Sequence, residues 1–184
     1  MTGVQTCALP IFFVLIFIFT LSYQPSPLVR SDYNLIKSLC SKADFPIFCL
    51  HCLTSDPSSK TASPRALSII AIHCAENEAN LWSEATSNLY ERAPNGSPLK
   101  KILQFCAGQA FVAREDFTAV LQSVIARDYG GAKYTLINQI QPLVDSCKID
   151  FLNNPNVPMP SVVAAGIQKV TIHCKNVEAI LSNI

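Results

Sequence analysis

Cysteines and histidines are the side chains of this sequence that could support redox chemistry or bind a metal. The chain has eight cysteines and three histidines. Cys49 and Cys52 form a C-x-x-C pair, which is typical of a thiol redox site or of half a zinc site. A zinc site needs a second pair of ligands and a thioredoxin-like site needs a surrounding βαβ pattern, and the sequence offers neither. We therefore favour a disulfide between Cys49 and Cys40, which leaves Cys52 buried or free.

The tripeptide Ile-His-Cys occurs twice, ending at Cys74 and at Cys174, and suggests the hypothesis of a His₂Cys₂ metal site. On a helix, adjacent side chains point about 100° apart, so each histidine would diverge from its cysteine. Both cysteines fall on apolar helical stripes, whereas His73 and His173 lie off-centre. We favour buried, inert thiols, rank a Cys74–Cys174 disulfide second, and rank a metal site third.

The rest of the sequence contains no recognisable catalytic arrangement. It lacks a G-x-S-x-G elbow, a P-loop, a dinucleotide glycine fingerprint and H-E-x-x-H. His51 has no evident base or nucleophile partner. Glu115 and Asp116 are adjacent on an expected helix, so they belong to a solvated face rather than an acid–base couple, and Trp82 and Tyr90 are expected to pack. The sequence therefore predicts no catalytic residue, no metal and no cofactor.

Two N-terminal stretches are set aside before the fold is considered. Residues 1–11, MTGVQTCALPI, resemble the translation of a sequencing-adapter oligonucleotide, so they and Cys7 are excluded. Residues 12–22 form an apolar run too short to span a bilayer, which takes about 20 residues, and they suit the remnant of a secretory signal peptide cut near Tyr23. The exported chain then holds seven cysteines, and an odd number leaves one thiol free or paired between chains.

Composition narrows the class of protein. The net charge is +1 and no long basic run occurs, so nothing points to nucleic acid, and the mature chain is not expected to bind a membrane. Only six residues are glycine and 49% are hydrophobic. This composition favours a packed bundle of helices over a loop-rich scaffold held by disulfides.

Residues 23–53 are expected to form an extended lead-in followed by a small helical hairpin. Asp32 is a suitable N-cap for the first short helix, and Pro46 can open the second at its first position. Cys40 and Cys49 flank the turn between them. Helices this short are hardly stable alone in water, so a disulfide would stabilise the hairpin.

Residues 54–184 are expected to form the main domain. A polar loop, Thr54–Ser63, is followed by four long amphipathic helices with helical apolar periodicity. They are expected to start near Pro64, Pro98, Gly131 and Ser161, with Ser63, Ser97 and Ser161 as caps. The inward stripe of the first includes Cys74, Leu81, Ala85 and Leu89. No segment alternates like a strand, so we predict an all-α fold, an up-down-up-down four-helix bundle with an N-terminal hairpin closed by a disulfide.

The second and third long helices are joined by the short break Arg127–Gly131. If this break reverses the chain, Cys106 and Cys147 meet at the same end of the pair, and a disulfide there would clamp the two helices. Pro142 interrupts the third helix, where an interior proline costs about 3 kcal/mol. We expect a kink or a break at residues 138–141.

One modification motif lies in the turn between the first two long helices. Asn95-Gly96-Ser97 is an N-glycosylation sequon in an expected surface turn. Pro98 follows it directly and lowers the expected occupancy of Asn95, so a chance match is an equal alternative.

The order and spacing of several segments resemble the plant invertase and pectin methylesterase inhibitors over residues 32–183. No single segment decides this, but together they are specific. They are Leu39-Cys40, Phe45-Pro-Ile-Phe-Cys49, Leu53-Thr-Ser-Asp-Pro-Ser58, Leu99-Lys-Lys-Ile-Leu-Gln-Phe-Cys106, Asp128-Tyr129 and Asp145-Ser-Cys-Lys-Ile-Asp-Phe151.

The resemblance implies a secreted four-helix bundle of the cell wall or apoplast, or of the vacuole, with disulfides Cys40–Cys49 and Cys106–Cys147 and an unpaired Cys174. It implies reversible occlusion of a partner enzyme, a pectin methylesterase or an invertase, with the first slightly favoured. The second and third bundle helices would present the contact surface. Its outward residues would be Gln104, Glu115, Gln122, Lys133, Asn138 and Gln141.

Three departures from the family pattern bear on inhibition. Ala110 stands where the family usually has tyrosine, Pro142 disturbs the expected contact surface, and Cys52 and Cys74 are additional. The alternative function is a secreted structural or small-ligand-binding bundle that does not inhibit. A sizeable apolar pocket between helices would favour that alternative.

Overall fold

The computed structural model describes residues 33–184, so the adapter-like stretch 1–11, the signal remnant 12–22 and the lead-in with the Asp32 cap lie outside it. Throughout the described residues the secondary structure is helical, without a strand. In chain order it consists of α2 (Tyr33–Cys40), α3 (Pro46–Ser55), the 3₁₀ helix η1 (Pro57–Thr61), α4 (Pro64–Arg92), α5 (Pro98–Ile125), α6 (Tyr129–Thr135), the π-helical turn η2 (Leu136–Ile140), α7 (Gln141–Asn153) and α8 (Ser161–Leu181).

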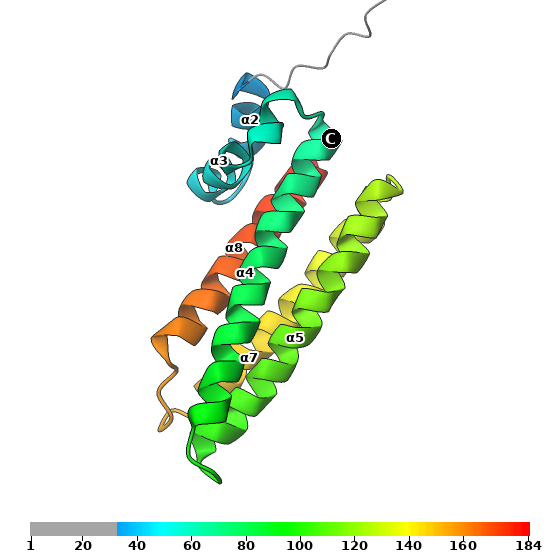
Figure 1. Ribbon diagram of the computed structural model, residues 1–184. Helices are drawn as coiled ribbons and strands as arrows, with labels where there is room; N and C mark the ends of the chain where they lie inside the picture. Colours follow the sequence, from blue (N-terminus) through cyan, green and yellow to red (C-terminus); the bar gives the residue numbers. More distant parts are fainter. Residues whose placement is uncertain (1–32) are drawn as a thin grey trace, which may run out of the picture.

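Four long helical rods form an up-down-up-down bundle, which confirms the predicted fold class. They are α4, α5, the uninterrupted segment α6–η2–α7, which we call the third rod, and α8. Helix α4 packs against α5 and α8, and α7 packs between α5 and α8 on the other side. The hairpin of α2 and α3 lies against α4 and α8 at one end of the bundle, as Figure 1 shows. The turn between α4 and α5 and the loop before α8 lie at the opposite end.

Helix starts follow from local sequence in most places. Ser63 and Ser97 each accept a bond from a backbone N–H three residues on, at 3.2 Å, with a proline in the first turn. Asp128 caps the third rod by accepting from Gly131 N at 2.8 Å, so this rod begins at Tyr129, before the expected Gly131. The expected Ser161 cap is wrong, because Pro160 occupies the cap position and Ser161 is already helical.

The predicted irregularity before Pro142 is present as a π turn. The N–H of Gln141 donates to the carbonyl of Leu136, five residues back, and η2 ends at Ile140. A proline has no N–H to donate and its ring would clash with the carbonyl four residues back. The wider turn accommodates this, so η2 and α7 follow one another without a loop.

The core of α4 differs from its predicted stripe. Leu81 is 49% exposed, and Ala85 and Leu89 are only half-buried. The buried line runs instead through small residues and Trp82, which is 1% exposed. The cause lies on α8, where a Cβ at Gly166 would be 2.5 Å from Cδ1 of Trp82. The missing side chain of Gly166 makes room for the indole.

Three disulfides hold the described residues together. Cys40–Cys49 closes the hairpin, with a Cα–Cα distance of 5.5 Å, and Cys106–Cys147 joins α5 to α7 at 4.9 Å. These are the two pairs expected from the sequence. The third, Cys52–Cys74 at 6.1 Å, ties α3 to α4 and corrects the favoured hypothesis of buried thiols at these positions. Cys174 remains a free, buried thiol.

The polar stretch Thr54–Ser63, expected to be a loop, contains η1. Asp56 caps it by accepting bonds from the backbone N–H of Ser58 at 2.8 Å and from its hydroxyl at 2.7 Å. These bonds lower the pKa of Asp56. The expected boundary between hairpin and bundle, at residues 53 and 54, falls inside α3.

Candidate functional site: the outer face of α5 and α7

The Cys106–Cys147 disulfide fixes two neighbouring helices, and the residues beside it in sequence face outward. Both sulfur-bearing residues are fully buried. Phe105 precedes Cys106, and Ser146 precedes Cys147. Since neighbouring positions on a helix diverge by about 100°, the covalent link inside the bundle places these side chains at its surface, on adjacent helices.

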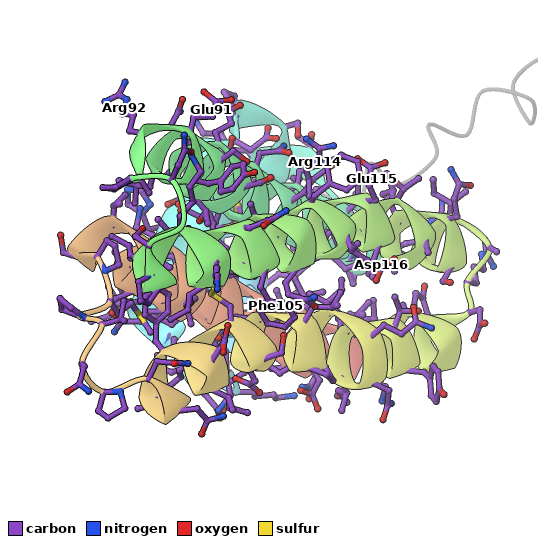
Figure 2. The ribbon with its side chains drawn as sticks, turned by 90° about the horizontal axis from the view of Figure 1, so that it is seen from below. Glu91, Arg92, Phe105, Arg114, Glu115 and Asp116 are labelled. Carbon is purple, nitrogen blue, oxygen red and sulfur yellow. A yellow bond between two sulfur atoms is a disulfide. The ribbon has the colours of Figure 1, made fainter. Side chains whose placement is uncertain are left out.

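A shallow groove of about 330 Å³ lies between the helices at this point. Its lining residues are Phe105, Ser146, Ile149, Asp150 and Asn153. Phe105 is 41% exposed and Ile149 is 52% exposed. Figure 2 shows Phe105 on the edge of α5 that faces α7. Two large apolar side chains with polar neighbours match the usual plan of a protein contact, with apolar anchors inside a polar rim.

Three charged residues lie further along α5, on two different sides of the helix. In Figure 2, Asp116 points toward the third rod, whereas Arg114 and Glu115 lie on the side of α4. Burial raises the pKa of Asp116. Arg114 donates from Nε to Oε1 of Glu115 at 3.0 Å, and its guanidinium lies 4.6 Å from the centre of the Phe111 ring. Phe111 and Arg114 are therefore held together by a cation–π contact, with Arg114 on the α4 side of α5.

The residues expected to contact a partner do not all share one surface. Gln104, Glu115 and Gln122 are exposed and form a row along α5. Lys133 lies toward α8, with Nζ 3.4 Å from Oγ of Ser182. Gln141 also lies at the α8 side, where its Nε2 donates to Asp145 and to Thr171.

Asn138 is exposed on η2 and its amide donates to the carbonyl of Tyr134 at 3.1 Å. The distances from Gln141 Nε2 are 3.2 Å to Oδ1 of Asp145 and 3.3 Å to Oγ1 of Thr171, which belongs to α8. Lys133 and Gln141 thus connect the third rod to α8, and Asn138 stays available on the outside.

Sequence reasoning missed the apolar members of this surface. Phe105 and Ile149 are exposed, as are Val112 on α5 and Leu152 on α7. The usable signal was position: each of these large apolar residues lies off the inward stripe of an amphipathic helix. Isolated exposed apolar residues are common, so only their shared location, visible in the fold, makes them a site.

The arrangements that could have supported enzyme chemistry are not formed. Cys49 and Cys52 are bonded to different partners, Cys40 and Cys74, so the C-x-x-C pair is not a redox couple. Since Cys74 is bonded to Cys52, the Ile-His-Cys repeats cannot supply four metal ligands. Within residues 33–184, no three histidine, cysteine or acidic side chains converge where they could hold a metal.

Burial shifts the pKa of two further titratable groups among residues 33–184, His173 and Cys174. His173 is half-buried, and burial lowers its pKa. Burial also raises the pKa of the Cys174 thiol to about 12, which makes the thiolate scarce and the residue unreactive. His73 contacts Glu76 at 3.1 Å on the surface of α4.

In the described part of the chain no helix is both long enough and apolar enough to cross a membrane.

Comparison with known proteins gives one family. The sequence model described as plant invertase/pectin methylesterase inhibitor matches residues 34–180. Cell wall / vacuolar inhibitor of fructosidase 2 from Arabidopsis thaliana is 25% identical over 114 residues, 60% of this chain and 63% of the relative. Pectinesterase inhibitor 28 from Oryza sativa subsp. japonica is 30% identical over 110 residues, 56% of this chain and 48% of the relative. The chain covers less than two thirds of either curated relative.

Solved structures show the same fold. A mutant form of a pectin methylesterase inhibitor from Arabidopsis superposes with a TM-score of 0.65 at 17% identity, over 80% of this chain and 95% of that one. Another crystal structure of a pectin methylesterase inhibitor, from Arabidopsis thaliana, gives 0.59 at 16% identity, over 82% and 96%. At these identities the likeness concerns the arrangement of the helices.

Proposed function

Because the chain belongs to the plant invertase/pectin methylesterase inhibitor family, we propose that it is a secreted inhibitor that binds and occludes a pectin methylesterase or an invertase. The single observation that carries the proposal beyond family membership is the outer face of α5 and α7. It is an exposed apolar groove on two helices that a disulfide holds together. Two large apolar side chains, Phe105 and Ile149, are exposed in this groove.

The proposed mechanism is occlusion by a rigid surface. Binding is weakened by every side chain and loop that must be ordered on association. Helix α5 is continuous from Pro98 to Ile125, and Cys106–Cys147 fixes its neighbour α7 against it. The two helices can thus meet an enzyme with their relative position already set, and less freedom is lost on binding.

The apolar side chains supply the anchors of this contact. Phe105 and Ile149 expose apolar surface that a partner would remove from water, at about 25 cal/mol per Å². Gln104, Glu115 and Gln122, which are exposed along α5, and Asn138, which is exposed on η2, supply further polar contacts in this proposal. Lys133 and Gln141, which bond to α8, act by positioning the third rod rather than by touching the partner.

The target remains one of two enzyme classes, and a pectin methylesterase is our first choice. The curated relatives carry both activities in their names, one as an inhibitor of fructosidase and one as a pectinesterase inhibitor. Three disulfides among the described cysteines suit an oxidising compartment. They support secretion to the cell wall or delivery to the vacuole as part of the proposal.

An inhibition assay tests this function. The purified chain, with its disulfides intact, is titrated into a plant pectin methylesterase and into a plant acid invertase, each at acid and at neutral pH. The proposal predicts saturable loss of activity of one enzyme, at one inhibitor per enzyme molecule. Full activity of both enzymes at every pH would reject it in favour of a non-inhibitory bundle.

A further inference from the structure

A second hollow lies on the other side of α7, at its seam with α8. It has a volume of about 380 Å³ and shares no residue with the groove between α5 and α7. Its walls come from segments far apart in sequence: Phe45 just before α3, Met159 in the loop before α8, and side chains of α7 and α8. We call it the seam pocket. Its volume is within the range of small-molecule sites, about 300–1,000 Å³.

The deep wall of the seam pocket is apolar and suits an aromatic ring. Ile167 and Ile172 line it from α8 and are 6% and 4% exposed. Phe45 brings an aromatic ring and Met159 a polarizable thioether, and both groups make favourable contacts with aromatic rings. A flat apolar body is therefore the part of a ligand that this wall would select.

The mouth of the pocket carries one positive charge, on Lys148, and one negative charge, on Asp145. Asp145, Lys148 and Thr171 line it. Asp145 and Thr171 already accept bonds from the amide of Gln141, at 3.2 and 3.3 Å. Lys148 is exposed and forms no ion pair with any residue from 33 to 184. Its ammonium is thus the group at the mouth that is best placed to gain from a ligand.

We propose that the seam pocket binds a small aromatic carboxylate, with the ring against Phe45, Met159 and Ile167 and the carboxylate on the ammonium of Lys148. Such a contact would be a charge-assisted hydrogen bond, which is stronger than a neutral one. The site is independent of enzyme inhibition, because it lies on the α8 side of α7. It would give this chain a ligand whether or not the outer face of α5 and α7 binds an enzyme.

Three probes that differ only in their head group test the chemistry. They are 3-phenylpropanoate, 3-phenylpropan-1-ol and 3-phenylpropan-1-amine, titrated into the intact chain by calorimetry at neutral pH. The proposal predicts saturable binding of one propanoate per chain. It also predicts that the alcohol binds about tenfold more weakly, the ratio expected for one charge-assisted bond. The amine should bind more weakly than the propanoate, because Lys148 repels it and the Asp145 carboxylate already accepts a bond from Gln141.

Substitutions locate the binding. Lys148→Ala should remove the preference for the propanoate over the alcohol, whereas Lys101→Ala, on an exposed position of α5, should leave it unchanged. Ala164 is exposed and lines the pocket, so Ala164→Phe should fill it and abolish binding of all three probes while the circular dichroism stays that of the native chain. The proposal is overturned if the wild type shows no saturable binding, if the amine binds more tightly than the propanoate, or if binding survives Ala164→Phe.

Discussion

Adding one methyl group to each of two helical glycines should change stability in opposite directions. Gly166 on α8 faces Trp82, and an added Cβ would lie 2.5 Å from Cδ1, 2.8 Å from Cγ and 2.9 Å from Cβ of that residue. Gly108 on α5 has nothing within 4 Å of its Cβ position. The same substitution, glycine to alanine, thus tests close packing at one site and helix propensity alone at the other.

The magnitudes follow from two competing effects. Alanine is favoured over glycine inside a helix by about 1 kcal/mol, so Gly108→Ala should stabilise the chain by about that amount. At Gly166 the added Cβ would clash with the buried indole and with the Cβ of Trp82, and rotation of the Trp82 side chain cannot move that Cβ. The overpacking cost should reach about 3 kcal/mol, the upper end of the usual range. After the propensity gain is subtracted, Gly166→Ala should be destabilising by about 2 kcal/mol.

Urea unfolding followed by circular dichroism at 222 nm measures both changes. A loss of about 2 kcal/mol corresponds to a Tm lower by about 4–8 °C in a chain of this size. Shortening the opposing residue gives the control: in a Trp82→Leu background, adding Gly166→Ala should cost little or nothing. The reasoning is refuted if Gly166→Ala stabilises the protein as Gly108→Ala does, or if its cost persists in the Trp82→Leu background.

Three other predictions follow from the disulfides and buried groups. Removing Cys52–Cys74 with Cys52→Ser and Cys74→Ser should cost about 3 kcal/mol, the loop-closure value for a sequence separation of 22 residues. Amides of α2 and α3 should exchange faster in hydrogen-exchange measurements, and unchanged exchange there would argue against the disulfide as the anchor of the hairpin. Cys174 should resist a thiol reagent at pH 8 until urea unfolds the chain, because burial raises its pKa to about 12; rapid labelling of the native protein would contradict this. Burial raises the pKa of Asp116 in the folded state, so the folded chain binds the proton more tightly and stability falls as pH rises through that pKa. Asp116→Asn should therefore increase stability at pH 7 and not below pH 3, and an equal gain at both pH values would exclude this explanation.

Several features of the fold could be predicted because they depend on local sequence. Ser63 and Ser97 each precede a proline, and this pair defines a helix start. Pro142 predicted the irregular turn η2, because a proline cannot donate a backbone hydrogen bond to the preceding turn of its own helix. Cys106 and Cys147 could be paired because one chain reversal between two antiparallel helices is enough to bring them to the same end of the pair.

The features that escaped prediction depend on how distant elements meet. The buried face of α4 includes Trp82 because α8 approaches α4 closely at Gly166. The sequence of α4 alone carries no information about this approach. Cys52–Cys74 requires α3 to lie beside α4, which follows from the docking of the hairpin. The early start of the third rod was a local miss, because Asp128 is itself a good cap.

Prediction of the candidate site was also limited by its dependence on how the helices pack. Polar residues on the outward side of α5, such as Gln104 and Gln122, could be predicted from helical periodicity. Lys133 and Gln141 could not be assigned to the seam with α8 before the neighbour of each face was known. The groove between Phe105 and Ile149 needs both helices at once, and it exists only in the assembled bundle.

The outer face of α5 and α7 is tested most directly by the inhibitory potency of a chain that carries both Phe105→Ala and Ile149→Ala. The matched control is Leu81→Ala, which removes a similarly exposed apolar side chain from α4. Against the enzyme that the wild type inhibits, we expect the double variant to lose at least about tenfold in potency, as truncation of two interface anchors typically costs more than 1 kcal/mol each. Leu81→Ala should inhibit as the wild type does. Equal potency of the double variant and the wild type, with both chains folded, would contradict the proposed surface.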